Sequence, residues 1–103
     1  MDIEFIKTPK PIGNFVNVRY TGNLAYISGQ GPFDDNGELI TGKVGEELNL
    51  EEAYDAARRV GISILSIIKN EIGFDKVNKI IKILGFVNCT KNFYLQPKVI
   101  NGC

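Results

Sequence analysis

The sequence predicts a single α+β domain in which a long helix packs on a small β-sheet. Three features support this class: a β-branched and aromatic run at residues 15–28, an amphipathic helical pattern after Asn49, and a second β-branched run at residues 77–87. With 103 residues and 44% hydrophobic content, the chain is long enough to bury a core without disulfides. We therefore expect one domain over residues 1–103, built from a hairpin, a long helix and a further strand.

The first predicted element is a β-hairpin. Residues 15–20 and 24–28 are rich in β-branched and aromatic side chains, which suit a pleated surface. Between them, Gly22 and Asn23 can adopt the positive φ values that tight hairpin turns require. The glycine-rich stretch that follows, residues 29–47, is long and irregular, which is typical of a functional loop.

The clearest predicted element is a helix that begins after Asn49. Asn49 and Glu52 have the spacing of a capping box, in which each side chain caps the backbone of the other residue. Inside the helix, Gly61 costs about 1 kcal/mol relative to alanine, and we expect close approach to a strand to offset that cost. Gly73 supplies the stop signal. One apolar stripe follows the helical spacing: Ala53, Ala57, Val60, Ile64, Ile68 and Ile72.

The run at residues 77–87 has apolar side chains on both faces of the predicted strand. One face would carry Ile81, Ile83 and Val87, and the other Ile80, Leu84 and Phe86. Both faces are therefore expected to be buried. Because one helix covers only one face of a small sheet, we expect the second face to pack against another copy of the chain. The alternative is a second layer within the chain, for which so short a sequence has little material.

A second helix is predicted to open between Phe93 and Ile100, with Pro97 in its first turn. No closing strand follows it before Cys103. The sequence is thus expected to lack the C-terminal strands that would complete its sheet.

Composition excludes several classes of function. The 12 basic and 12 acidic residues cancel, which argues against a dedicated surface for nucleic acid or anionic membrane. No apolar run approaches the ~20 residues that cross a bilayer. The chain has no histidine, and its two cysteines, Cys89 and Cys103, lack the spacing of metal ligands. We therefore expect no metal, no cofactor and a reducing, cytoplasmic setting.

The candidate ligand-binding stretch is Ser28-Gly29-Gln30-Gly31-Pro32, a flexible bend that exposes its backbone directly after an apolar strand. Ser28 has no evident base to activate it as a nucleophile. Among the arginines, Arg58 and Arg59 are predicted to be solvated charges on the polar helix face. Arg19, on the first hairpin strand, is a possible substitute cation for a ligand. Its neighbour Tyr20 either walls the cleft or packs on the sheet.

Several segments together resemble the Rid (YjgF-type) reactive-intermediate deaminase family. The resemblance extends in order from Pro11 to Cys103, and other segments indicate a less-studied branch. It implies a chorismate-mutase-like α+β subunit with helices on one face of a mixed sheet, and a homotrimer with ligand clefts between subunits. The segments that carry it are Ile12-Gly13-Asn14-Phe15-Val16, the hairpin, Ser28-Gly29-Gln30-Gly31-Pro32, the helix from Asn49, and Gly85-Phe86-Val87-Asn88 followed by Phe93.

The resemblance also implies an activity for the complete protein. Established members hydrolyse reactive enamines and imines, made by pyridoxal-phosphate enzymes from amino acids such as serine and threonine, to 2-keto acids and ammonia without a cofactor. The alternative is a trimer that binds small metabolites such as 2-keto acids without turnover. Endoribonuclease activity, a name often attached to this family, is disfavoured by the neutral charge and the absence of histidine.

Site residues carry over from the family only in part. Phe15 stands where well-studied members have a tyrosine, Gly29 matches the position whose backbone faces the ligand, and Phe93 matches an aromatic wall of the cleft. With Ser28 and Gln30, these are the predicted substrate-binding residues.

Two departures from the family pattern weaken the catalytic assignment. Pro97 occupies the position of an asparagine that makes a polar contact. The arginine and the glutamate of the family mechanism belong to strands expected beyond Cys103. No catalytic residue is therefore assigned within the chain.

Overall fold

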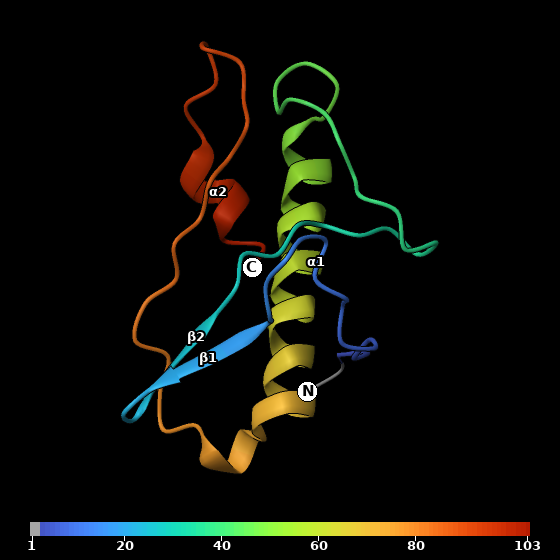
Figure 1. Ribbon diagram of the computed structural model, residues 1–103. Helices are drawn as coiled ribbons and strands as arrows, with labels where there is room; N and C mark the ends of the chain where they lie inside the picture. Colours follow the sequence, from blue (N-terminus) through green and yellow to red (C-terminus); the bar gives the residue numbers. More distant parts are fainter. Residues whose placement is uncertain (1–2) are drawn as a thin grey trace.

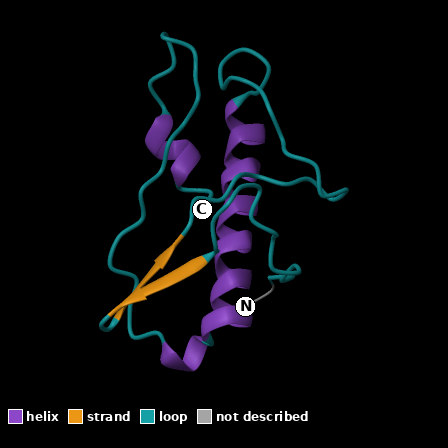
Figure 2. Cartoon of the chain, in the orientation of Figure 1, coloured by secondary structure: helices purple, strands orange, loops and turns teal. Residues whose placement is uncertain are grey.

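The structure, a computed structural model, describes residues 3–103 and confirms the predicted α+β class (Figures 1 and 2). A short hairpin lies beside one long helix, and irregular segments run along both of them. The elements in chain order are β1 (Val18–Thr21), β2 (Leu24–Ile27), α1 (Leu50–Ile67), the π-helical turn η1 (Ile68–Ile72), the 3-10 turn η2 (Phe74–Lys76) and α2 (Gln96–Ile100).

The hairpin forms where it was predicted, although its first strand is shorter. β1 and β2 pair antiparallel from Val18↔Ile27 to Thr21↔Leu24, which leaves a two-residue turn. Gly22 in that turn has a φ of 57°, as expected, whereas no residue other than glycine among residues 3–103 has a positive φ, so the expectation for Asn23 was wrong. Glycine alone therefore supplies the left-handed conformation of the turn.

The capping box of α1 is confirmed. The Glu52 amide donates to Asn49 Oδ1 at 2.8 Å, and the Asn49 amide donates to Glu52 Oε1 at 3.0 Å. Together they satisfy two of the backbone donors left open at the helix start. The helix continues through η1 and ends at Gly73, whose φ of 99° breaks it as predicted.

The main core lies between α1, α2 and the loop that precedes α1. Val44, Ala53 and Val99 are its buried centre. Around them pack the partly buried residues Leu50, Ala57, Val87, Cys89 and Phe93. Further along the helix, Ile67 is completely buried and Ile68 is 4% exposed. The buried stripe of α1 thus follows the predicted helical spacing only in part.

Two glycines allow the C-terminal end of the chain to lie against α1. A Cβ on Gly102 would collide with the carbonyl oxygen of Tyr54, and a Cβ on Gly61 would lie 2.9 Å from the Cys103 carbonyl oxygen. The expectation that Gly61 faces a strand was therefore wrong. The close approach exists, but it is to the last residue of the chain.

The further strand expected at residues 77–87 does not form within residues 3–103, and the sheet is two-stranded and antiparallel rather than mixed. Just after this segment, Cys89 forms an isolated parallel bridge with Val44. Five of the apolar side chains that were expected to be buried are exposed, from 56% at Ile80 to 87% at Phe86. The sixth, Val87, is partly buried and packs against the core cluster. A strand needs a hydrogen-bonded neighbour, and none of the described segments supplies one here.

Residues 5–8 contact the C-terminal end of α1 and the η1 turn that follows it. The Ile6 amide donates to the buried Ser66 hydroxyl at 3.1 Å, and Asn70 donates to Thr8 Oγ1 at 3.1 Å. The ammonium group of Lys69 lies 4.5 Å from the ring centre of Phe5.

Among the helices of residues 3–103, none has the length and apolar character needed to cross a membrane.

Candidate functional site

A surface depression of about 350 Å³ brings together two of the predicted ligand-binding residues, Phe15 and Ser28. They come from different segments, because Phe15 precedes β1 whereas Ser28 directly follows β2. Antiparallel pairing places the start of β1 beside the end of β2, and the Ser28 amide extends that pairing by donating to the Asn17 carbonyl at 2.9 Å. The hairpin therefore builds the depression. Its lining residues are Asn14, Phe15, Val16, Arg19 and Ser28.

The hydroxyl of Ser28 is held by the backbone opposite. Its Oγ donates to the carbonyl oxygen of Val16 at 2.5 Å. The proton is thus committed to the backbone, while the oxygen can still accept a hydrogen bond. Gln30 Nε2 in turn donates to the Ser28 carbonyl at 3.1 Å, so this side chain folds back on its own bend. Both groups shape the bend.

Gly29 lies on the open side of the bend. A Cβ at this position would meet no atom within 4 Å, so packing does not require glycine there. The residue is exposed, which leaves its backbone accessible as the family resemblance implies.

Phe93 is not brought into this depression. It is half-buried against the core cluster of Val44, Ala53 and Val99, and its carbonyl accepts from Gln96 Nε2 at 2.9 Å. Pro97 occupies the first turn of α2, as predicted. Within one chain, the predicted aromatic wall is therefore separate from the residues that line the depression.

Two lining residues, Asn14 and Val16, were missed by sequence analysis. They flank Phe15 in a tight bend, where the Phe15 amide donates to the Gly13 carbonyl at 2.9 Å. The only sequence signal for them was their position beside Phe15. Arg19, considered beforehand as a possible cation, does line the depression.

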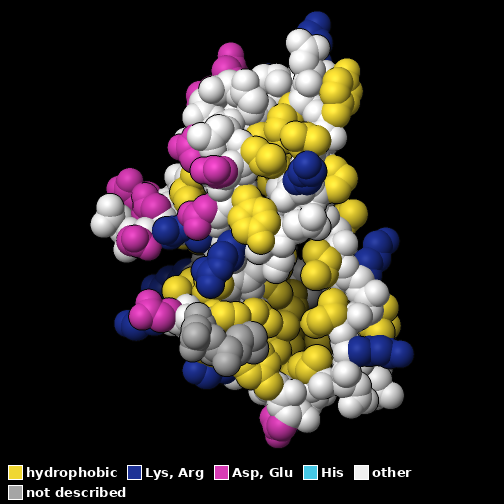
Figure 3. Space-filling model, turned by 180° about the vertical axis from the view of Figure 1, so that it is seen from behind, with side chains coloured by type: hydrophobic (Ala, Val, Ile, Leu, Met, Phe, Trp, Pro, Cys, Tyr) yellow, Lys and Arg dark blue, Asp and Glu magenta, His cyan; other side chains and the backbone are white. Residues whose placement is uncertain are grey.

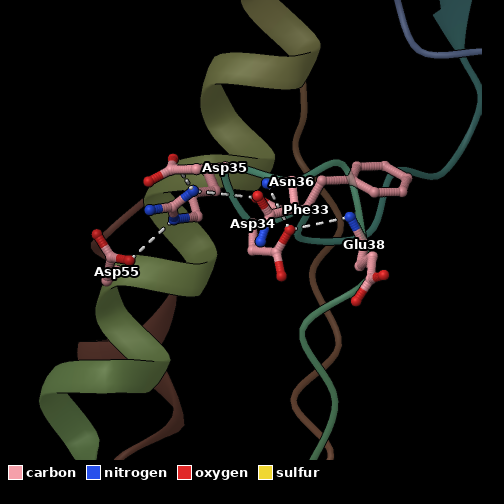
Figure 4. A network of polar contacts seen from close by, with 7 residues as sticks. Phe33, Asp34, Asp35, Asn36, Glu38 and Asp55 are labelled. Atoms are coloured by element: carbon pink, nitrogen blue, oxygen red, sulfur yellow. Dashed lines mark hydrogen bonds and ion pairs between the residues drawn. The ribbon is translucent and has the colours of Figure 1, made fainter.

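A polar network joins the glycine-rich loop to α1 (Figure 4). Arg59 donates to Asp55 Oδ2 and Asp35 Oδ1, each at 3.0 Å, and to the Phe33 carbonyl at 3.2 Å. The hydrogen bonds that Arg59 donates to Asp55, and next those to Asp35, raise the pKa of the guanidinium. The expectation that Arg59 is a solvated charge was wrong, because its guanidinium donates hydrogen bonds both to α1 and to the loop. Arg58 is exposed, as expected.

A second depression of about 350 Å³ lies at the start of α1, lined by Ile40, Leu48, Glu51, Glu52 and Asp55. Two of its carboxylates already have partners, since Glu52 caps the helix and Asp55 binds Arg59. Among residues 3–103, no group of three or more histidine, cysteine or acidic residues could hold a metal ion. We therefore take the depression at the hairpin as the candidate site.

The chain belongs to the Endoribonuclease L-PSP family, whose model matches residues 5–103. This is the YjgF-type family that the sequence resembles. Protein TCP17 of Trypanosoma cruzi is 33% identical over 93 residues, covering 89% of this chain and 58% of that protein. A RutC family protein of Pyrococcus abyssi is 28% identical over 80 residues, covering 75% of this chain and 63% of that protein.

Solved structures share the fold. The Agrobacterium tumefaciens protein Atu1372, of unknown function, has a TM-score of 0.81 and 37% identity, over 89% of this chain and 60% of that one. A Shewanella oneidensis protein provisionally described as an endoribonuclease has a TM-score of 0.90 and 24% identity, over 97% of this chain and 67% of that one. At that identity the likeness shows the fold alone. The chain spans about three fifths of the length of the curated relatives.

Proposed function

We propose that the protein to which this chain belongs hydrolyses reactive enamines and imines to 2-keto acids and ammonia. The observation that supports this most directly is the depression that Phe15 and Ser28 share. Phe15 was assigned to the ligand from the family resemblance, and Ser28 from the bend that follows the strand. The reaction class is the one that the family resemblance implies, and membership of that family supports the proposal.

The proposed reaction needs only water. An enamine first becomes the imine when a proton moves from its nitrogen to the neighbouring carbon. Water then adds its oxygen to the imine carbon and a proton to the nitrogen. As the carbon–nitrogen bond breaks, the hydroxyl proton passes to the leaving nitrogen, which gives a 2-keto acid and ammonia. In this scheme the ring of Phe15 packs on the flat conjugated substrate, and the accessible backbone at Gly29 faces it. Among residues 3–103, no carboxylate side chain lines the depression. The chain's contribution is thus to bind and orient the substrate.

The proposal includes a homotrimer with its ligand clefts between subunits. The uncovered apolar side chains of residues 80–86 support association, because soluble monomers rarely expose so large a patch. Figure 3 shows hydrophobic side chains gathered around a hollow on the face turned away from the view of Figure 1. In such an assembly we expect Phe93 of one protomer to face Phe15 of its neighbour. The two unpaired thiols, Cys89 and Cys103, support a reducing, cytoplasmic setting.

The second candidate function is binding of 2-keto acids without turnover. It is favoured by the lack of a general base in the depression, and by Phe15 and Pro97 in place of the polar residues of well-studied family members. Cleavage of RNA has less support, because the chain has no histidine and its net charge is zero.

An ammonia-release assay distinguishes the two candidates. A pyridoxal-phosphate-dependent dehydratase would generate 2-aminoacrylate from serine, with semicarbazide present as a competing trap. We expect added protein to speed ammonia release and lower the yield of trapped adduct in proportion to its concentration. Saturable binding of 2-ketobutyrate without faster release would establish the sensor instead. If the protein neither speeds ammonia release nor binds 2-ketobutyrate, both candidates are contradicted.

A matched pair of variants tests the role of the depression. Phe15→Tyr restores the hydroxyl found in well-studied members and is expected to raise the rate. Phe74→Tyr adds the same hydroxyl to a residue of η2 outside the depression, and it is expected to change nothing.

A further inference from the structure

We infer that Arg19 binds the carboxylate of the ligand, so that the depression selects small 2-oxo and 2-imino acids. The ligand class rests on the proposed function, whereas the role of Arg19 rests on its position. This residue is not one that the family resemblance assigns to the carboxylate.

The hairpin fixes the position of Arg19. The residue lies in the middle of β1 and pairs with Tyr26 on β2, so its backbone is held by the ladder. Its side chain lines the depression together with Phe15 and Ser28. Of the described residues, Arg19 is the only one with a charged side chain in that lining, which makes the depression a cationic spot on a protein of zero net charge.

No carboxylate of residues 3–103 satisfies this guanidinium. The ion pairs found in that part of the chain, within 4.0 Å, both belong to Arg59, and Arg19 makes no side-chain hydrogen bond there. Arg59 shows what a structural arginine looks like in this fold, with two carboxylates and a carbonyl as partners. Arg19 has the opposite arrangement: the hairpin holds its backbone, and its side chain is exposed with its donors available.

The chemistry of the lining fits a small planar acid. A guanidinium binds a carboxylate through two parallel hydrogen bonds, which fixes orientation as well as charge. Asn14 can donate to a 2-oxo group, Ser28 Oγ can accept from an imine nitrogen, and Phe15 offers an apolar surface. The volume of about 350 Å³ lies near the lower limit for ligand pockets, which favours a small metabolite over a nucleotide.

The test compares an acid with its uncharged amide. Dissociation constants of 2-ketobutyrate and 2-ketobutyramide would be measured by titration calorimetry for the wild-type chain, Arg19→Gln, Arg19→Lys and Arg58→Gln. Arg58 is the matched control, since it is an exposed arginine of α1 outside the depression. We expect Arg19→Gln to weaken binding of the acid about ten- to hundredfold and to leave the amide unchanged, as the loss of a charge-assisted pair implies. Arg19→Lys should lose part of that affinity, and Arg58→Gln none.

Three results would overturn the inference: equal affinity of the wild-type chain for acid and amide, equal loss in Arg19→Gln and Arg58→Gln, or no binding of either compound. Circular dichroism would verify that each variant folds. The proposed hydrolysis is judged separately by ammonia release. Turnover with Arg19-independent binding overturns only the inference, whereas Arg19-dependent binding without turnover overturns only the hydrolysis.

Discussion

The burial of apolar side chains differs between two parts of the molecule. The anchored side is the core between α1, α2 and the loop before α1, and the other side consists of the hairpin and residues 77–87. On the anchored side, Val44, Ala53 and Val99 are at most 5% exposed, because α1, α2 and the preceding loop close around them. On the other side, Ile81 is 70% and Phe86 is 87% exposed. Apolar character alone therefore does not bury a residue; a covering element must be present.

The comparison indicates what residues 77–87 require. Their pattern suits a strand covered on both faces, yet they have no regular strand partner among residues 3–103. Burying apolar surface stabilises a protein by roughly 25 cal/mol per Å², so this segment gains by association. We therefore expect other copies of the chain to cover it.

The largest expected effect is on the free energy of unfolding, when the same Ile→Ala substitution is made on each side of the molecule. Ile67→Ala removes a completely buried side chain and should lower the free energy of unfolding by about 2–5 kcal/mol. Ile81→Ala, at a 70% exposed position, should change it by less than about 0.5 kcal/mol in the monomer. Urea unfolding followed by circular dichroism at low protein concentration measures both. Equal losses would mean that the two sides do not differ in packing.

A charge in the uncovered segment should prevent association. Phe86→Asp places a carboxylate at the most exposed of the large apolar residues, where it would be desolvated in an interface. We expect light scattering to report a monomer with unchanged helical signal. The control is Tyr54→Asp, a 46% exposed position on α1, which should leave the mass unchanged. A Phe86→Asp protein that assembles like the wild type would exclude this segment from the interface.

Loss of the helix cap should give an intermediate effect. Asn49→Ala removes the acceptor for the Glu52 amide and should cost about 1 kcal/mol of stability. Asn36→Ala is the control, because only the backbone amide of Asn36 is bonded in the loop turn. If both variants unfold at the same urea concentration, the capping box contributes nothing measurable to α1.

The smallest expected effect concerns pH. The Lys43 amide donates to Glu47 Oε2 at 2.8 Å, and this bond lowers the pKa of Glu47 below its ordinary 4.5. A carboxyl group whose pKa is lower in the folded state stabilises the fold at pH values above its unfolded pKa. That contribution is lost as pH falls through the folded pKa. Between about pH 5 and pH 3, the wild type should therefore lose slightly more thermal stability than Glu47→Gln. If the two proteins lose the same thermal stability between these pH values, the Glu47 carboxylate does not contribute to the fold.

Local signals account for what the sequence predicted well. The hairpin follows from a glycine turn between β-branched runs, and α1 follows from its capping box and from Gly73. The contacts of Arg59 with Phe33 and Asp35 could not be predicted, because they join residues 26 and 24 positions apart. The same holds for Gly61, whose neighbour is the chain end.

The candidate site was predictable to a similar degree. Resemblance to a family pointed to Phe15, and the glycine-rich bend after the strand pointed to Ser28. The hairpin register then brings Arg19 beside them. Phe93 was predicted for the same cleft, yet in one chain it packs on the core. The contacts of one chain therefore do not support Phe93 as part of this depression.

The mass of the 103-residue chain in solution tests the central claim most directly, because that claim is that copies of the chain cover one another's exposed side. Light scattering on a size-exclusion column, at concentrations well above any expected dissociation constant, is the measurement. We predict a uniform species of three times the 11.4 kDa chain mass. A stable, folded monomer of 11.4 kDa would contradict the account.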